Sequence, residues 1–321
     1  MSSIASPAAK PHSQAATDGS FRHYARAVLT LNVVVIVWGA FVRASHSGDG
    51  CGGHWPFCNG QAIPQAPEAG TVIEYLHRLS SGAALLAVFA LCVWAWRRFP
   101  RGHQIRLFGA LSLVCILVEG ALGAGLVVFG LVAGNASPAR AIYLSAHLTN
   151  TLGLLASLTL VAWLAGDPSR LLRSRRIPRL LWAALGIDLL VSVTGVIAAL
   201  GDTLYPAASF SGGIAQDFRA ASPGLLRLRL IHPAIAVVAA LFLLYAGIAL
   251  PRRTASEAVR NAGALLVVLV LIQVMAGVIN VWLLAPVWMQ LAHLFIGSML
   301  WIVLVVLTAA SAETGWRSKP A

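Results

Sequence analysis

Charged residues are scarce in this chain. Only 11% of its 321 residues are Asp, Glu, Lys or Arg, whereas 58% are hydrophobic. A soluble protein carries about 25% charged residues, so this composition excludes one and predicts an integral membrane protein. Acidic residues are especially few, with 11 Asp and Glu against 23 Lys and Arg, for a net charge of +12. Such an excess can indicate nucleic-acid binding, but the positions of the basic residues argue against it.

Long apolar runs supply the first structural prediction. A helix needs about 20 apolar residues to cross a bilayer, and eight such runs are present. The first is too long for a cleaved signal peptide and no small-residue cleavage site follows it. Residues 1–22, rich in Ala, Ser and Pro at their start, are predicted to be a disordered tail. The eight runs are Tyr24–Val42, Thr71–Trp96, Gln104–Gly130, Ala141–Leu164, Pro178–Leu200, Gly224–Leu250, Ala258–Leu284 and Pro286–Ala310.

The basic residues predict the orientation of these helices, because cytoplasmic loops carry the excess of Lys and Arg. Of the 23 basic residues, 17 fall in the tails and in every second loop. Both termini are therefore predicted to be cytoplasmic, and no nucleic-acid footprint is expected. The opposite side holds six basic residues, which are Arg43, Arg78, Arg140, Arg219, Arg227 and Arg229.

A cysteine-bounded loop follows the first run, in the stretch HSGDGCGGHWPFCNG from His46 to Gly60. It faces the outer, oxidising side, where Cys51 and Cys58 can stay bonded. The surrounding glycines and Pro56 supply the tight backbone that so short a ring needs. The loop is expected to be a disulfide-held cap, with a redox-active pair as the alternative. Cys92 and Cys115 lie inside apolar runs and are interpreted as packing residues.

Weak internal similarity divides the chain into two halves of four helices. Four spans return the chain to its starting side, so the halves are predicted to be parallel four-helix bundles, related by an axis along the membrane normal. Their boundaries are 23–165 and 166–321. The matches, in the same order in both halves, are VWGA at 37–40 with VTGV at 193–196, His77 with His232, Glu119-x-x-x-Gly123 with Gln273-x-x-x-Gly277, and Ala146-His147-Leu148 with Ala292-His293-Leu294.

Four of the nine histidines stand on the even-numbered runs, one on each: His77, His147, His232 and His293. Each lies about two helical turns from the outer end, roughly 9–12 Å at 1.5 Å per residue. A single histidine in a membrane helix can simply bond to a neighbour. Four at one depth, in repeated positions, indicate function, because ionisable groups in lipid are costly.

Paired imidazoles on facing helices are typical of haem ligation. A bare zinc site would more often include Cys, Asp or Glu at short spacing. Each half thus supplies one pair, His77 with His147 and His232 with His293. All four lie toward the outer face, and haems side by side near one surface suggest chemistry between them rather than electron transfer across the bilayer.

Glu74 distinguishes the halves. It precedes His77 by three residues and shares its helix face, whereas Arg229 stands at the corresponding place before His232. Glu74 is therefore a candidate acid–base or charge-stabilising group. A salt bridge with Arg78 is the alternative.

These residues together resemble the haem A synthase family. The similarity covers nearly the whole chain after the tail and rests on GAFVRASHSGDGCGGHWPFCNG, IEYLHRLSSG and the later AHL, IHP and AHLFIG segments. It implies an oxidoreductase that converts the carbon-8 methyl of haem O to a formyl group for cytochrome oxidase assembly. It further implies that His77 and His147 bind the substrate haem O, that His232 and His293 bind a cofactor haem b, and that Glu74 is catalytic. Arg43, Arg78 and Arg229 are candidate propionate partners.

The resemblance also implies a setting. It places the protein in a bacterial inner membrane, with the haem sites toward the outer face, and suggests haem O synthase and oxidase assembly factors as partners. One departure is that the outer loop at 201–223 lacks the second cysteine pair found in many bacterial members.

Two other classes stay open on the residues alone. A di-haem membrane electron carrier of the quinol-linked cytochrome b type would use similar ligands without needing Glu74. A transporter would need polar sites at the bilayer midplane, for which Glu119 and Asp188 are candidates. In the repeat these align with Gln273 and Asn32, which favours hydrogen bonds between buried helices.

Overall fold

The computed structural model describes residues 19–173, 177–218 and 224–313, without the side chains of 224–228. This part of the chain is helical, and eight helices are long and apolar enough to cross a membrane, as predicted. In order, the helices are α1 (Gly19–Ala44), α2 (Ala69–Arg98), α3 (Gln104–Val128), α4 (Pro138–Gly166), α5 (Arg179–Leu204), the short α6 (Phe210–Phe218), α7 (Gly224–Ala249), α8 (Glu257–Trp282) and α9 (Val287–Glu313), with a 3₁₀ turn η2 (Pro251–Arg253) after α7.

A helix satisfies most of its backbone groups internally, as lipid requires, and several of the spanning helices begin at a capping residue. Ser137 accepts a bond from the backbone of Arg140 at the start of α4, where Pro138 occupies the first turn. Ser256 caps α8 in the same way. A serine that binds the free N–H groups of the first turn sets the start of a helix, and these starts agree with the predicted runs to within a few residues.

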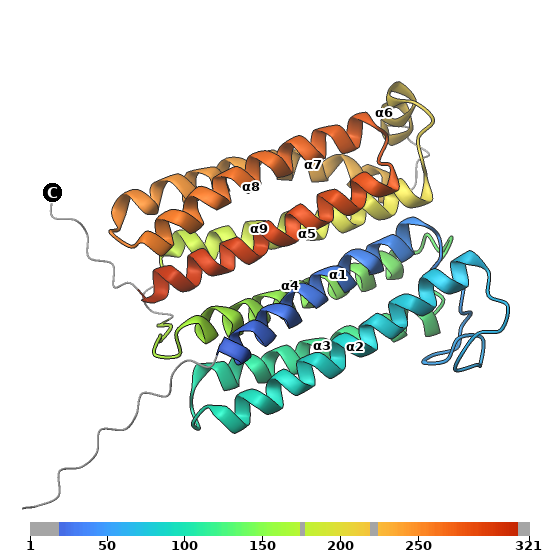
Figure 1. The fold of residues 1–321 in the computed structure, drawn as a ribbon. Helices are drawn as coiled ribbons and strands as arrows, with labels where there is room; N and C mark the ends of the chain where they lie inside the picture. Colours follow the sequence, from blue (N-terminus) through green and yellow to red (C-terminus); the bar gives the residue numbers. More distant parts are fainter. Residues whose placement is uncertain (1–18, 174–176, 219–223, 314–321) are drawn as a thin grey trace, which may run out of the picture.

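The helices pack in two groups of four (Figure 1). In the first bundle, α1 and α3 each contact both α2 and α4; in the second, α5 and α8 each contact both α7 and α9. Contacts of α4 with α5 and α9, and of α1 with α9, join the bundles. The two helices that carry histidines in each bundle thus stand at opposite corners. The two-fold relation between the bundles stays a prediction.

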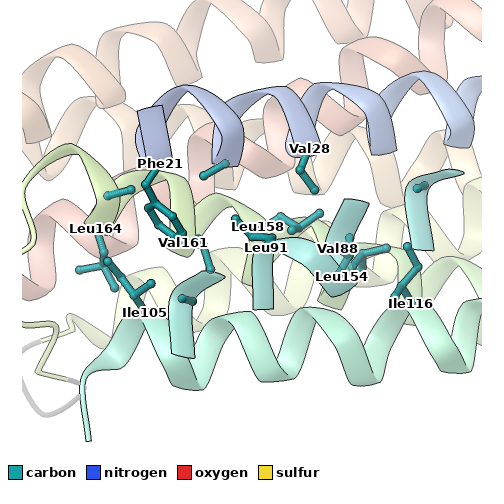
Figure 2. Packing of buried hydrophobic residues seen from close by; sticks show 14 of the residues in the cluster. Phe21, Val28, Val88, Leu91, Ile105, Ile116, Leu154, Leu158, Val161 and Leu164 are labelled. Atoms are coloured by element: carbon teal, nitrogen blue, oxygen red, sulfur yellow. The ribbon is translucent and has the colours of Figure 1, made fainter. Parts of the chain in front are cut away.

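Each bundle has its own buried hydrophobic cluster, located in one half of its length. The first cluster runs from Phe21 to Val35 in α1 and from Leu154 to Ala165 in α4, with matching parts of α2 and α3. Figure 2 shows Phe21, Leu158 and their neighbours interdigitating between the four helices. The second cluster uses the corresponding parts of α5, α7, α8 and α9. Both clusters occupy the end where α1 begins and α9 ends.

Side chains also connect the bundles. The indole of Trp301 in α9 donates a 2.8 Å hydrogen bond to the carbonyl of Leu152 in α4. At the end where α9 finishes, Trp163 donates to Glu313, and the guanidinium of Arg170 lies 4.4 Å from the centre of the Trp163 ring. These contacts hold α4 against α9, so the seam between the bundles is specific rather than purely apolar.

Two segments differ from the sequence-based expectation. Helix α1 begins at Gly19, so residues 19–22 are helical rather than part of a disordered tail; residues 1–18 lie outside the described part. The segment expected to be a loop at 201–223 contains the end of α5 and all of α6. Among the outer basic residues, Arg219 and the side chain of Arg227 are not described.

Candidate functional site

The four histidines lie near the same end of the molecule, away from the hydrophobic clusters. They stand eight, nine, eight and six residues after the first residues of α2, α4, α7 and α9, for His77, His147, His232 and His293 respectively. At 1.5 Å per residue this is roughly 9–14 Å along each helix. Each bundle is therefore tightly packed at one end and carries its histidine pair at the other.

Each bundle contains one pair of histidines. His77 on α2 and His147 on α4 belong to the first bundle, and His232 on α7 and His293 on α9 belong to the second. Because each pair stands on opposite corners of a four-helix ring, the two imidazoles can approach one planar group from its two faces. Each bundle thus contains the two histidines that the sequence analysis paired, and their joint binding of one haem stays a prediction.

A glycine in the neighbouring helix adjoins the first histidine of each pair. A methyl group built on Gly39 in α1 would lie 2.9 Å from Cε1 of His77, and one on Gly195 in α5 would lie 3.0 Å from Cε1 of His232. Carbon atoms do not approach so closely without displacement. A side chain at Gly39 or Gly195 would therefore force the adjacent imidazole to shift.

The second histidine of each pair also faces a glycine, in α3 or α8. A methyl group on Gly277 would lie 3.2 Å from Cε1 of His293, and one on Gly123 would lie 3.8 Å from Nε2 of His147. The four glycines belong to the repeated segments found in the sequence. The repeat thus includes both the four histidines and the glycine that lies beside each of them.

The ring nitrogens have different partners. Nδ1 of His147 lies 2.8 Å from Oε1 of Glu119, and Nδ1 of His232 lies 3.2 Å from the hydroxyl of Thr194. Among the residues that the structure describes, Nδ1 of His77 and Nδ1 of His293 are buried without a hydrogen-bond partner. Sequence reasoning treated Glu119 as a helix-packing group and overlooked its contact with the histidine.

The polar residues expected near the bilayer midplane only partly form the hydrogen bonds between helices that the sequence analysis favoured. Glu119 does bond across helices, since its carboxylate accepts from Asn150 and Thr151 of α4. Asn32, however, donates to the carbonyl of Val28 in its own helix. Oδ2 of Asp188 is buried with no hydrogen-bond partner in the described part of the chain. The expectation of interhelical hydrogen bonds therefore holds for Glu119 and is wrong for Asn32.

Glu74 is buried, with 3% of its surface exposed. Its Oε1 accepts bonds from Arg78 at 3.1 Å to Nε and 2.5 Å to the terminal nitrogen. Its Oε2 accepts a 2.9 Å bond from the backbone N–H of Cys51. The salt bridge considered from the sequence is thus present, and the same carboxylate also holds the cysteine-bounded loop.

That loop contains the predicted disulfide between Cys51 and Cys58, whose Cα atoms are 4.3 Å apart. Both cysteines are buried. The backbone of Asn59 donates to the carbonyl of Cys51, and Cys58 and Gln61 exchange two 2.9 Å backbone bonds. The ring is therefore a compact, internally bonded unit rather than a flexible connection.

Three further bonds attach this loop to α2. Arg78 donates to the carbonyls of His54 at 2.6 Å and Phe57 at 2.8 Å. The hydroxyl of Thr71 donates to the carbonyl of Gly50 at 2.7 Å. The cap therefore rests on the first turns of the helix that carries Glu74 and His77.

The remaining candidate propionate partners are bonded to protein groups. Arg43 of α1 reaches into the second bundle and donates to the carbonyl of Ala199 at 2.8 Å, to Thr203 at 2.5 Å and to Gln290 at 3.1 Å. It thereby joins α1 to α5 and α9 near the histidine end.

Arg229 has acidic partners. It forms a 3.0 Å ion pair with Asp202 of α5 and a second ion pair with Asp217 of α6. Where the first bundle pairs Glu74 with an arginine, the second therefore pairs an arginine with two carboxylates. The charge at this repeated position is reversed, and in both bundles it holds a cap at the histidine end.

Helix α6 is the cap of the second bundle. Asp217 is buried, whereas Phe210, Ile214 and Phe218 are exposed on one face. An amphipathic helix of this kind suits the membrane interface. The four-residue spacing of its apolar side chains was the available sequence signal, but it spans only nine residues.

Comparison with known proteins supplies the family. The model of the COX15-CtaA family, described as cytochrome oxidase assembly protein, matches residues 22–71 and 67–305. A relative from Thermus thermophilus named "Protoheme IX farnesyltransferase" is 42% identical over 294 residues, which are 91% of this chain and 48% of that protein.

Shorter similarities link the chain to proteins named "Heme A synthase". One from Halalkalibacterium halodurans is 43% identical over 98 residues, covering 30% of this chain and 33% of the relative. Another, from Exiguobacterium sibiricum, is 31% identical over 163 residues, covering 51% and 54%. The chain spans about half the length, or less, of these relatives. Since the family model matches most of its length, the chain belongs to the COX15-CtaA family of cytochrome oxidase assembly proteins.

Proposed function

We propose that this protein is a haem A synthase, an enzyme that oxidises the carbon-8 methyl of haem O to a formyl group. In this proposal His77 and His147 bind haem O in the first bundle, and His232 and His293 bind haem b in the second. The observation that carries it is the recurrence, in both bundles, of two histidines on opposite corners, each beside a glycine.

The residues fit a haem. Two imidazoles on different helices of one bundle would hold the iron of a haem between them. The buried nitrogens of His77 and His293 that have no partner among the described residues are consistent with groups that await a ligand. The hydrophobic clusters lie at the opposite end of each bundle, so the histidines are not part of the packed core.

The relatives support haem chemistry, and the assignment to haem A rests on several of them being named for its synthesis. The Thermus relative is named for farnesyl transfer to protohaem. Because this chain spans 48% of that protein, the name does not by itself assign farnesyl transfer to the matched part.

The proposed reaction divides the work between the bundles. Haem b held by His232 and His293 would supply electron transfer. The conversion of the methyl to a formyl group removes four electrons and adds one oxygen atom, through two hydroxylations to a geminal diol that loses water; an external oxidant such as dioxygen would have to supply the oxygen and be reduced to water. Glu74, three residues before His77, would stabilise charge or move a proton at its carboxylate oxygens. Arg78 holds that carboxylate, and the disulfide loop covers it from water.

The setting follows from the same proposal. An excess of Lys and Arg at the end where α1 begins and α9 finishes supports a cytoplasmic location for that end. The histidines and both caps then lie toward the outer face of a bacterial inner membrane, where the disulfide is stable. Haem O synthase and oxidase assembly factors are the expected partners, since one supplies the substrate and the others receive the product.

Substitution of Glu74 by Gln tests the proposal. The change keeps the side-chain size and helix propensity but removes the charge and the titratable proton. We expect both haems to remain bound and haem A formation to fall by about 10²-fold or more, with haem O or a hydroxylated intermediate accumulating. The measurement is chromatography of haems extracted after co-expression with a source of haem O.

Thr71→Val is the matched control, because it removes one attachment of the loop and leaves the Glu74 carboxylate intact. Equal losses in the two variants would assign Glu74 to loop anchoring alone. Near-parental haem A formation by Glu74→Gln would reject the catalytic role. If the parental protein holds only haem b and never yields haem A, the di-haem electron carrier is the better description.

A further inference from the structure

Glu119 holds one of the four histidines in a way that the sequence did not predict. Its Oε1 lies 2.8 Å from Nδ1 of His147. The same carboxylate accepts hydrogen bonds from Asn150 and Thr151 on the next turn of α4, and Asn150 also donates to the carbonyl of Cys115 at 2.8 Å. The carboxylate thus occupies Nδ1 of His147 and leaves Nε2 as the nitrogen that could bind the proposed iron.

The second bundle has no such carboxylate at this position. Gln273 replaces Glu119 in the repeat, and its amide nitrogen lies 3.4 Å from Nε2 of His293. Gln273 thus occupies Nε2 of His293, and Nδ1, which has no hydrogen-bond partner in the described part of the chain, is the nitrogen left to bind an iron. His232 contacts a neutral hydroxyl, that of Thr194, at 3.2 Å. His147 is therefore set apart from the other histidines by an anionic partner.

A carboxylate that accepts the N–H of a metal-bound imidazole fixes the ring orientation and makes the ring a stronger electron donor. A stronger donor stabilises oxidised iron over reduced iron and lowers the reduction potential. We infer that Glu119 is a positioning residue that gives the iron bound by His147 a lower reduction potential than the iron bound in the second bundle. This inference rests on the haem ligation proposed above.

The functional consequence is a difference between two otherwise similar sites. At equilibrium, reducing equivalents favour the second bundle, whose histidines have neutral partners or none in the described residues. The first bundle, which holds the proposed substrate, favours the oxidised state. This difference in reduction potential matches the proposed roles, because the second bundle would hold the electron-transferring haem b and the first would hold the haem O that is oxidised.

The test exchanges the residues at the repeated position. Glu119→Gln keeps a hydrogen-bond acceptor of the same size beside His147 and removes its charge. In protein purified with both haems, redox titration followed by visible absorption should show a higher potential for the first-bundle haem. We expect its oxidised-to-reduced ratio at a fixed potential to fall at least tenfold. For a one-electron couple this corresponds to a rise of ~59 mV in the reduction potential.

Repeating the titration in a His232→Ala background, which is expected to retain the first-bundle haem alone, assigns the signal. Gln273→Glu is the reciprocal variant and should lower the potential of the second-bundle haem. If Glu119→Gln prevents haem binding, Gln273→Glu decides the matter: an unchanged or raised second-bundle potential would overturn the inference. An unchanged first-bundle potential in Glu119→Gln, with both haems bound, would overturn it equally. Absence of haem from the parental first bundle would instead defeat the proposed function.

Discussion

At the scale of single residues, the glycine beside each histidine is as informative as the histidine. A glycine in a membrane helix has several uses, including close helix packing. Here Gly39 and Gly195 approach an imidazole so closely that no larger residue fits without displacement. The position of each imidazole therefore depends on having glycine at the neighbouring position.

Alanine at these positions should therefore disturb haem binding in one bundle at a time. Overpacking costs about 1–3 kcal/mol, which corresponds to roughly 5- to 150-fold weaker binding. Gly39→Ala should weaken the first site and Gly195→Ala the second, as measured by haem content and titration. Gly120→Ala is the control, because a methyl group there meets no atom within 4 Å. Equal haem content in all three variants would contradict the proposed arrangement.

At the scale of elements, each bundle is closed at its histidine end by a different device. The first has a disulfide loop held on Glu74 and Arg78, and the second has α6 held on Arg229. Both devices attach to the helix that carries the first histidine of the pair. A cap fastened in this way can exclude water from the site without contributing to the packed core.

Cys51→Ser tests the first cap. A disulfide that closes so short a ring stabilises the fold by only about 2–3 kcal/mol. The four packed helices should therefore survive the loss of this disulfide. We expect haem A formation to fall more than thermal stability does, and Cys58 to become a free thiol. Labelling of intact cells with and without reductant measures this, with Cys92→Ala as the control. Full labelling of Cys58 in the unreduced parental protein would contradict the disulfide.

At the scale of the whole molecule, two bundles with separate cores share a seam. The buried members of the two clusters are different residues, while Trp163 packs against both clusters, and Arg43 and Trp301 also connect the bundles. Damage at one histidine pair should therefore stay within its bundle. The seam keeps the two proposed haem sites in a constant relation to each other.

His232→Ala and His293→Ala should each remove tightly held haem b and leave the first site able to bind haem O. The expected result is a halving of haem per chain with the helical content unchanged, read from absorption spectra and haem extraction. His46→Ala is a suitable control, since His46 lies outside the spanning helices. Unchanged haem content in both variants would remove the second pair from the proposal.

The sequence by itself determined the eight spans and the depth of the four histidines. These depend on the length of apolar runs and on the 1.5 Å rise of a helix, both of which are local properties. The disulfide was also predictable, because its two cysteines lie only seven positions apart in one short loop. Internal repetition identified the glycines, although not what they contact.

Only the tertiary structure decided the contacts between elements far apart in the chain. Arg43 bonds to residues more than 150 positions away, Glu119 meets His147 from another helix, and the Glu74 carboxylate binds the backbone of Cys51. Helix α6 was missed because nine residues are too few for a periodic signal to stand out. The three long-range contacts share one physical reason. Composition sets which segments enter the membrane, but the distances between side chains are set by how the helices pack, and no single segment contains that information.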